Sequence, residues 1–261
     1  MMRQTAILSA TLLLASVHAL AAGASPKSPV DYVSPNIGSI GQLLSATAPF
    51  VQVPYGMARL VPVTTPGIQD RYLADKIYGF SAGAGMLMVA TGSVSPESAA
   101  YASDFDHDFE RATPYYYAVD LQTWSSRAEY TATQHAGFYR FTLPASSSAH
   151  VILSLGKGAE LAVVGPNALQ GSQRITGTVA TAVDLTKETR LYFYVEFSRP
   201  FGSYQTWRDH TLQNEDSVHG DQIGFVSTQS TTTGEQIEAR IGLSYISAEQ
   251  ACLLYTSPSP R

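Results

Sequence analysis

One short stretch of the sequence carries a candidate nucleophile. Gly79-Phe80-Ser81-Ala82-Gly83 matches G-x-S-x-G, the turn that exposes the catalytic serine of α/β-hydrolases between a strand and a helix. Only Ile77 and Tyr78 precede it as a candidate strand, and no Gly-rich oxyanion segment is present. A serine hydrolase that uses Ser81 is therefore one alternative. The other is a Gly- and Ala-rich loop in which backbones approach closely.

A second stretch carries carboxylates at the spacing that opens a calcium loop. Asp104, Asp106 and Asp108 form D-x-D-x-D, but the sixth and twelfth positions hold Phe109 and Tyr115 where an EF-hand needs Gly and Glu. The EF-hand interpretation therefore fails. The three aspartates remain weak candidates for an irregular calcium site, because hard cations accept irregular sets of oxygen ligands. The alternative is a solvated loop of turn-forming acids.

A third stretch concentrates charge in a chain that has little of it. Asp70-Arg71-Tyr72-Leu73-Ala74-Asp75-Lys76 holds four charges in seven residues. Guanidinium forks and carboxylates can bind vicinal sugar hydroxyls, and a tyrosine ring can lie on the C–H face of a sugar. Asp70, Arg71, Tyr72 and Asp75 are therefore candidate substrate-binding residues. A surface loop of weak salt bridges is the competing interpretation.

The elements that must position these residues are mostly strands. Alternating or β-branched runs are joined by short Gly-containing or polar turns, and helical periodicity is weak. In the run Arg190 to Ser198, alternation predicts Tyr192 and Tyr194 on one face of the strand and Phe193 on the other. Many strands at short spacing predict an all-β fold, an antiparallel β-sandwich. The other predicted strands are Arg127 to Gln134 and Phe138 to Leu143, joined by His135-Ala136-Gly137, then Val151 to Leu155, Arg174 to Val183, Ile223 to Gln229 and Gln236 to Ile246.

Composition excludes several classes of protein. The chain has 261 residues, of which 14% are charged, with a formal net charge of -5 and one cysteine. An acidic balance argues against a nucleic-acid partner, which would call for a basic surface. A single cysteine excludes an internal disulfide framework and a Cys-rich zinc site. No segment after the N-terminus is long and apolar enough to predict a membrane span.

The N-terminus has the pattern of an export signal. Arg3 is followed by the uncharged apolar run Ala6 to Val17 and by the small-x-small site Ala19-Leu20-Ala21. The run is too short for a spanning helix, which needs about 20 apolar residues. We expect residues 1–21 to be a signal peptide and residues 22–30 to be a linker. The predicted location is the bacterial periplasm or the cell exterior.

The C-terminal sequence predicts the start of a helix and, soon after it, prolines that would end the helix. Ser247-Ala248-Glu249-Gln250 fits an S-x-x-Q capping box, so a helix should start there. Pro258 and Pro260 cannot lie inside a helix, and we expect little of it to form. We interpret residues 252–261 as a non-native tail, because CLLYTSPSPR resembles a translated sequencing adapter.

Several stretches in order resemble the N-terminal domain of family-92 glycoside hydrolases, which are calcium-dependent exo-acting α-mannosidases. The order and spacing agree from residue 31 to about residue 251. The chain departs from the commoner family pattern at Ala82 to Met88, where many members carry a histidine. The matching stretches are Tyr32 to Gly38, Val53 to Met57, Lys76 to Ser81, Ala112 to Tyr117, Ala128 to Thr133, Ala136 to Phe141, Tyr194 to Phe201 and Ile241 to Ser247.

The resemblance implies a supersandwich-like domain over residues 31–246. It also implies that residues 247–251 begin a helical linker to an (α/α)6 catalytic domain that this chain lacks. The inverting acid and base carboxylates and most calcium ligands would lie in that domain. The expected function is removal of terminal α-mannose from glycans by the parent enzyme, with the fragment itself inactive. His107 and Asp108 join Asp70 to Asp75 as candidates at the sugar-facing edge. A free-standing carbohydrate-binding module is the main alternative.

Overall fold

The computed structural model of the protein describes residues 27–39, 47–64, 74–175 and 189–256. The predicted signal peptide, the candidates Asp70, Arg71 and Tyr72, and most of the predicted strand Arg174 to Val183 lie outside the described residues. The chain divides after Tyr32 into two units. The described part of the first unit contains the 3-10 turn η1 (Pro29–Tyr32). All the strands belong to the second unit.

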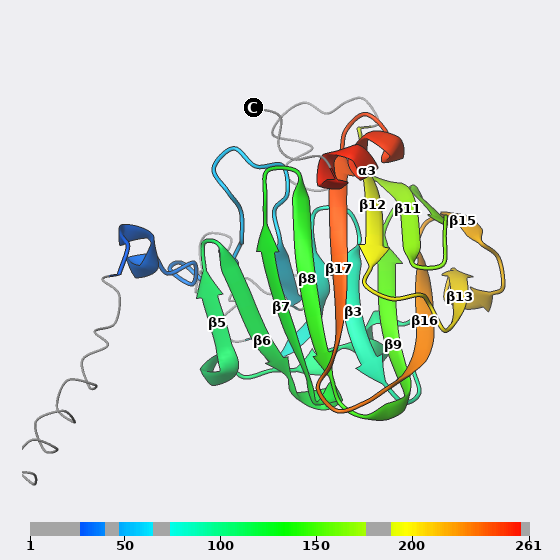
Figure 1. Ribbon diagram of the computed structural model, residues 1–261, viewed down its shortest axis with the longest axis horizontal. Helices are drawn as coiled ribbons and strands as arrows, with labels where there is room; N and C mark the ends of the chain where they lie inside the picture. The colour runs from blue at the N-terminus through cyan, green and yellow to red at the C-terminus, as the bar shows by residue number, and fades with distance from the viewer. Residues whose placement is uncertain (1–26, 40–46, 65–73, 176–188, 257–261) are drawn as a thin grey trace, which may run out of the picture. The chain divides into compact units, whose positions relative to one another are not determined.

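Two antiparallel sheets make up the second unit (Figure 1). Within the described residues, the eight-stranded sheet has the order β1-β2-β3-β9-β16-β13-β14, with β4 paired to β2. The nine-stranded sheet has the order β15-β10-β11-β12-β17-β8-β7-β6-β5 and lies in front in Figure 1. The predicted all-β sandwich is therefore confirmed.

Each sheet is assembled from strands that are distant in the sequence. The strands of the eight-stranded sheet are β1 (Val61–Thr64), β2 (Lys76–Ser81), β3 (Met86–Thr91), β4 (Ser103–Asp104), β9 (Ser146–Leu155), β13 (Ser203–Arg208), β14 (Thr211–Gln213) and β16 (Ile223–Thr231). Those of the nine-stranded sheet are β5 (Glu110–Thr113), β6 (Tyr116–Leu121), β7 (Ser126–Ala132), β8 (Ala136–Leu143), β10 (Ala159–Val163), β11 (Ala168–Arg174), β12 (Arg190–Phe197), β15 (Ser217–Gly220) and β17 (Glu235–Ser244). The short helical elements are α1 (Ser98–Tyr101), η2 (His107–Phe109), η3 (Gln122–Trp124) and α3 (Ala248–Thr256).

Alternation along the strands decides which side chains enter the core. In β12, Leu191, Phe193, Val195 and Phe197 are buried between the sheets, while Tyr192 and Tyr194 are only partly buried. The predicted division of this strand into two faces is confirmed. Aromatic rings dominate the core: Phe80 from the eight-stranded sheet lies 5.7 Å from the ring of Tyr130 in the other sheet. Burying such rings supplies most of the driving force for joining two sheets.

Local details differ from the predictions in two places. The turn between β7 and β8 lies at 133–135, so Ala136 and Gly137 are part of the strand and not of the turn. The C-terminal helix is longer than expected, because α3 runs to Thr256 and ends just before the prolines. Its cap is as predicted: the Ser247 hydroxyl accepts a hydrogen bond from the Gln250 amide at 3.1 Å. None of the helices in the described part of the chain is long and apolar enough to cross a membrane.

Candidate functional site

Ser81 does not occupy a nucleophile elbow. It is the last residue of β2, and the chain turns directly back into β3, where Ser81 pairs with Met86. Gly83 donates its backbone N–H to the Ser81 hydroxyl at 3.1 Å, which uses that oxygen to hold the hairpin. Since no helix follows the serine, the strand-turn-helix geometry that exposes a hydrolase nucleophile is missing. The serine-hydrolase alternative is therefore wrong.

The three aspartates of the D-x-D-x-D stretch point to different partners. Asp104 is paired with Lys76 at 2.5 Å between Nζ and Oδ1, and also accepts from the Thr123 hydroxyl. This hydrogen bond from Lys76 lowers the pKa of Asp104 and raises the pKa of Lys76. Asp106 instead caps η2, where its Oδ1 accepts from the Asp108 amide at 2.9 Å.

These residues do not fit a calcium ion. A calcium site needs several oxygen ligands converging on one point. Asp104 accepts a hydrogen bond from the Lys76 ammonium group, and Asp106 accepts one from a backbone amide. Within the described residues, no group of three or more Asp, Glu, His or Cys side chains could hold a metal ion.

The candidates Asp75, His107 and Asp108 come close together through the backbone. The Phe105 amide donates to the Asp75 carbonyl at 3.2 Å, so the segment before β2 lies beside the loop that carries His107. Asp75 and Asp108 are exposed. The His107 Nδ1 lies 2.6 Å from Oε2 of Glu110, whose side chain is only 4% exposed. Sugar binding by these residues stays a prediction.

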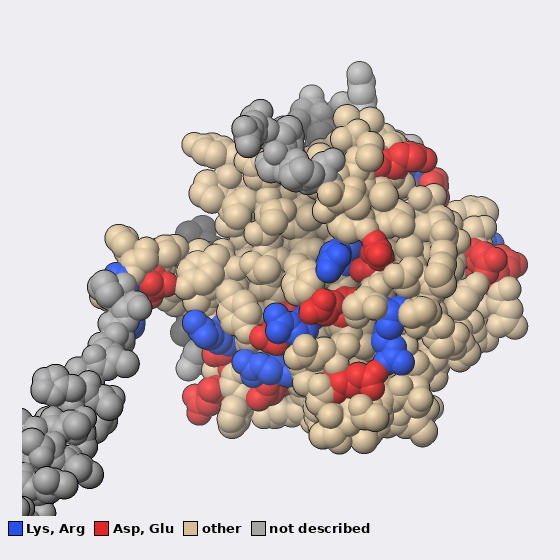
Figure 2. All heavy atoms as spheres, in the orientation of Figure 1, with Lys and Arg blue, Asp and Glu red and all other residues tan. Residues whose placement is uncertain are grey.

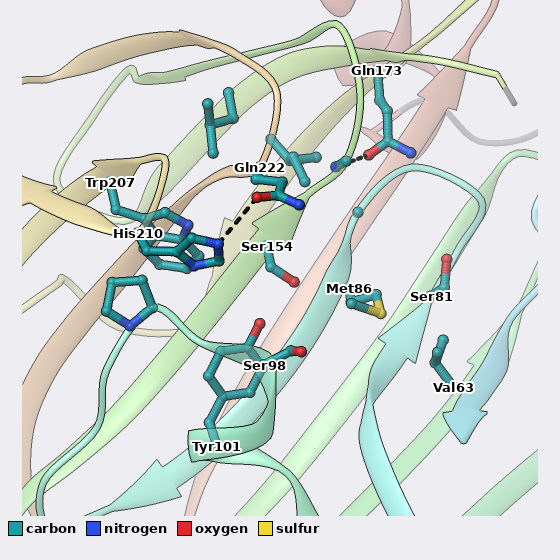
Figure 3. A pocket seen from close by; sticks show the side chains of 15 residues that line it. Val63, Ser81, Met86, Ser98, Tyr101, Ser154, Gln173, Trp207, His210 and Gln222 are labelled. Carbon is teal, nitrogen blue, oxygen red and sulfur yellow. Dashed lines mark hydrogen bonds between the residues drawn. The ribbon is translucent and has the colours of Figure 1, made fainter. Parts of the chain in front are cut away.

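A cavity that the sequence analysis missed lies on the eight-stranded sheet. Its volume is about 330 Å³ (Figure 3). It is lined by Val63, Ser81, Gly85, Met86, Pro96, Ser98, Tyr101, Ser154, Leu155, Gly156, Gln173, Trp207, His210, Gln222 and Ile223. Most of these are neutral polar or apolar residues, and within the part of the chain that the structure describes the lining contains no Lys, Arg, Asp or Glu. Such a mixture suits a neutral ligand that offers both hydroxyl groups and C–H surface.

Strand pairing builds the floor of this cavity. Ser81 pairs with Met86, Met86 with Ser154, Ser154 with Gly224, and Gly224 with Trp207. The residues of this cross-strand row alternate along their strands with Leu87, Leu153 and Phe225, which are buried in the core. The row therefore lies on the face of the sheet that points away from the nine-stranded sheet.

Turn geometry places the polar groups at the cavity rim. Asp209 and His210 join β13 to β14 with φ values of 47° and 61°, which turns the chain tightly between paired strands. The His210 Nε2 lies 3.1 Å from Gln222 Oε1, and its Nδ1 lies 3.1 Å from a carboxylate oxygen of Glu97. The Gln173 side chain accepts from the Gly156 amide at 2.9 Å.

Two hydroxyl groups stand deeper in the cavity. The Ser154 Oγ is buried and adjoins the phenol of Tyr101. Burial raises the pKa of the Tyr101 phenol, an effect that the neighbouring Ser154 hydroxyl opposes. The phenol therefore stays protonated at neutral pH and is available as a donor. Because a hydroxyl group can both donate and accept, each of these two groups keeps a hydrogen-bonding position that a ligand could use.

Comparison with known proteins identifies the domain. The sequence model of the glycosyl hydrolase family 92 N-terminal domain matches residues 32–244. Comparison with curated protein sequences finds no match. Among solved structures, the inverting mannosidase BT2199 of family GH92 from Bacteroides thetaiotaomicron VPI-5482 shares the fold, with a TM-score of 0.78 and 23% identity over 88% of this chain.

Two further solved structures agree. The α-mannosidase BT3965 of family GH92, from Bacteroides thetaiotaomicron, has a TM-score of 0.74 at 22% identity over 85% of this chain. The family GH92 glycosyl hydrolase ccman5 has a TM-score of 0.74 at 24% identity over 86%. The chain spans about a third of the length of each, 33% of BT2199 and ccman5 and 34% of BT3965. The chain thus belongs to glycosyl hydrolase family 92, whose N-terminal domain its residues 32–244 form.

Proposed function

We propose that this chain is the N-terminal domain of an exported α-mannosidase, and that it contacts the glycan without hydrolysing it. The match of the family's N-terminal domain over residues 32–244 carries this proposal. The chain spans a third of the mannosidases that share its fold, which leaves two thirds of such an enzyme to supply the catalytic groups. The predicted signal peptide supports export.

Hydrolysis with inversion needs a carboxylic acid to protonate the leaving oxygen and a carboxylate, about 6.5–9.5 Å away, to activate a water. Glu196 and Glu238 are two carboxylates of this chain that share a cavity, which has a volume of about 260 Å³ and lies on the nine-stranded sheet. Glu196 accepts a hydrogen bond from Tyr255, and Arg240 lines the same cavity. Because Arg240 lies directly opposite Glu196 in the strand register, we assign these carboxylates to the charged surface of the sheet and not to hydrolysis.

Calcium belongs to the same proposal. The described residues do not fit the ion, so we expect any calcium that the parent enzyme needs to be bound outside them. Added calcium should therefore leave the melting temperature of this chain unchanged. Isothermal titration with calcium chloride, with a calcium-binding family enzyme as the positive control, measures this directly. Stoichiometric binding with micromolar affinity would contradict it.

The experiment for the main proposal has two parts. Reading the coding DNA beyond codon 251 should reveal a frame that continues into a long helical region containing the missing carboxylate pair. A stop codon at that point in the genome would overturn it. Separately, the purified chain should not hydrolyse an aryl α-mannoside under conditions in which a full-length family enzyme does. If turnover is found and is lost in Glu196→Gln and Glu238→Gln, the catalytic carboxylates would lie in this chain and the proposal would be wrong.

A further inference from the structure

A second cavity adjoins the one described above. It has a volume of about 230 Å³ and lies on the same outward face of the eight-stranded sheet. Its floor comes from Ile152, Val226 and Gln205, which form the next outward row along the paired strands β9, β16 and β13. Pro96 and Trp207 line both cavities. The two cavities therefore adjoin at one tryptophan, and we refer to them together as the groove.

The divider between the two cavities is held in place by the sheet. A Cβ at Gly224 would lie 2.1 Å from Cζ2 of Trp207, so glycine at this position lets the indole lie directly against the strand. Trp207 itself is buried, with 3% of its surface exposed. It thus acts as a fixed wall between the cavities and not as an open stacking surface.

The roof of the second cavity is also anchored. His150 is buried, and its Nε2 lies 2.6 Å from the carbonyl oxygen of Gly92, which accepts a hydrogen bond from it. The Nδ1 of His150 lies 3.0 Å from the Thr228 hydroxyl. These bonds tie the start of the segment that leads to Pro96 to the sheet below. The groove is therefore preformed, which lowers the entropic cost of binding a ligand.

The groove offers neutral hydrogen-bonding groups along its length. Gln222 uses its carbonyl oxygen for His210, which leaves the amide NH₂ group free to donate; Figure 3 shows that group directed into the cavity. The buried Ser154 hydroxyl faces the same space. Among the described residues, no Lys, Arg, Asp or Glu lines either cavity, and the Glu97 carboxylate at the rim is already used by His210. An ionic ligand would therefore lose its hydration without gaining a free counter-charge from these residues. A purely apolar ligand would leave these donors and acceptors unsatisfied.

We propose that the groove binds two consecutive sugar units of a neutral glycan, one on each side of Trp207. This rests on the proposed function for the class of ligand, and on the two cavities for the number of units. The residues named here all belong to this chain, so we expect the groove to bind a glycan without a further domain. Its role is to hold a glycan chain on the sandwich.

Calorimetric titration of the whole chain with methyl α-mannoside and with α-linked mannobioses tests the proposal. The mannobioses should bind about tenfold more tightly or better, because the second unit adds at least one hydrogen bond and buries further C–H surface. Digalacturonate should not compete. Equal affinity for methyl α-mannoside and the mannobioses would overturn the proposal that two sugar units are bound. Tighter binding of digalacturonate than of the mannobioses would overturn the proposal that the ligand is neutral. Absence of binding to every mannoside would overturn the whole proposal.

Variants locate the site. Gln222→Ala in the first cavity and Gln205→Ala in the second should each weaken mannobiose binding by about three- to tenfold, the equivalent of one hydrogen bond. Gln236→Ala, at an exposed position of β17 in the other sheet, is the matched control and should bind as the parent chain does. Melting curves verify that all three variants fold. Equal weakening in the control would place the site elsewhere. The proposed function is tested independently by the coding DNA, so the two can fail separately.

Discussion

The two sheets turn faces of opposite character toward solvent. On the nine-stranded sheet, outward positions pair charges across strands: Asp120 with Arg127, Glu129 with Arg140 and Glu196 with Arg240. Figure 2 shows this face, with acidic and basic side chains interspersed over it. On the eight-stranded sheet, the outward rows that pass through Ser154 and Ile152 carry no charged residue among the residues that the structure describes.

The difference in charge between the two faces indicates that they have different functions. A ladder of alternating charges keeps a sheet soluble and discourages pairing with other chains, at little gain in stability. Uncharged rows that are lined by cavities and carry neutral hydroxyl and amide groups can hydrogen-bond to a ligand. In a chain with only 14% charged residues, charge is therefore present on the outward rows of one sheet and absent from the two rows described on the other.

The largest difference in stability between the two sheets is expected from replacing one glycine in each sheet by alanine. A Cβ at Gly224 would meet the Leu153 carbonyl oxygen at 2.5 Å as well as the Trp207 ring, and neither can retreat inside the sheet. A Cβ at Gly242 would meet the Ala251 carbonyl oxygen at 2.1 Å, but α3 is a terminal helix and can lift away. Gly224→Ala should therefore cost about 1–3 kcal/mol or more. We expect Gly242→Ala to cost less.

Urea unfolding followed by circular dichroism measures both changes. Tryptophan fluorescence should shift in Gly224→Ala only, because the added methyl group displaces the indole. If Gly242→Ala proved the more damaging substitution, α3 would be an integral part of the fold, and its description as a replaceable terminal helix would be wrong.

A smaller contrast concerns the charge ladder. Arg140 stands between Glu129 and Glu238 in the pairing register, and its Nε lies 4.0 Å from the Glu129 carboxylate. Arg140→Ala should cost about 0.2–1 kcal/mol at low salt, and about 0.5 M sodium chloride should reduce the difference by screening the charges. Gln205→Ala on the uncharged face should show no such salt dependence. Equal salt dependence of the two variants would contradict the division between the faces.

Sequence patterns predicted the strands better than the surfaces that they form. Alternation in residues 190–197 identified both the strand and its buried face, because side-chain direction has period two. The groove depends instead on which strands become neighbours, and β9 pairs with β16 from more than sixty positions away. Only that pairing brings Ser154, Gly224 and Trp207 into one row. The acidic loop stands out by its composition, yet its carboxylates are used by Lys76 and by a helix cap.

The smallest effect on stability is expected from the ion pair between Lys76 and Asp104, at the edge of the eight-stranded sheet. The Lys76 ammonium lowers the pKa of Asp104, so the ionised carboxylate contributes stability above the unfolded pKa of aspartate and loses it as pH falls through the folded value. Lys76→Met should raise the pKa of Asp104 toward its ordinary range and flatten the acid side of the stability profile. Thr123→Val, which removes a weaker donor, should raise this pKa less. Carboxyl NMR titration measures both, and an unchanged Asp104 titration in Lys76→Met would show that the ion pair does not persist in solution.

The most direct test of the division between the faces is an amide NMR titration of the labelled chain with an α-linked mannobiose. We predict saturable shifts at Gly156, Gln222 and Gly92, around the groove, and none at Arg140 or Glu238 on the charged ladder. Shifts confined to the charged ladder, or no shifts at millimolar sugar, would contradict that division.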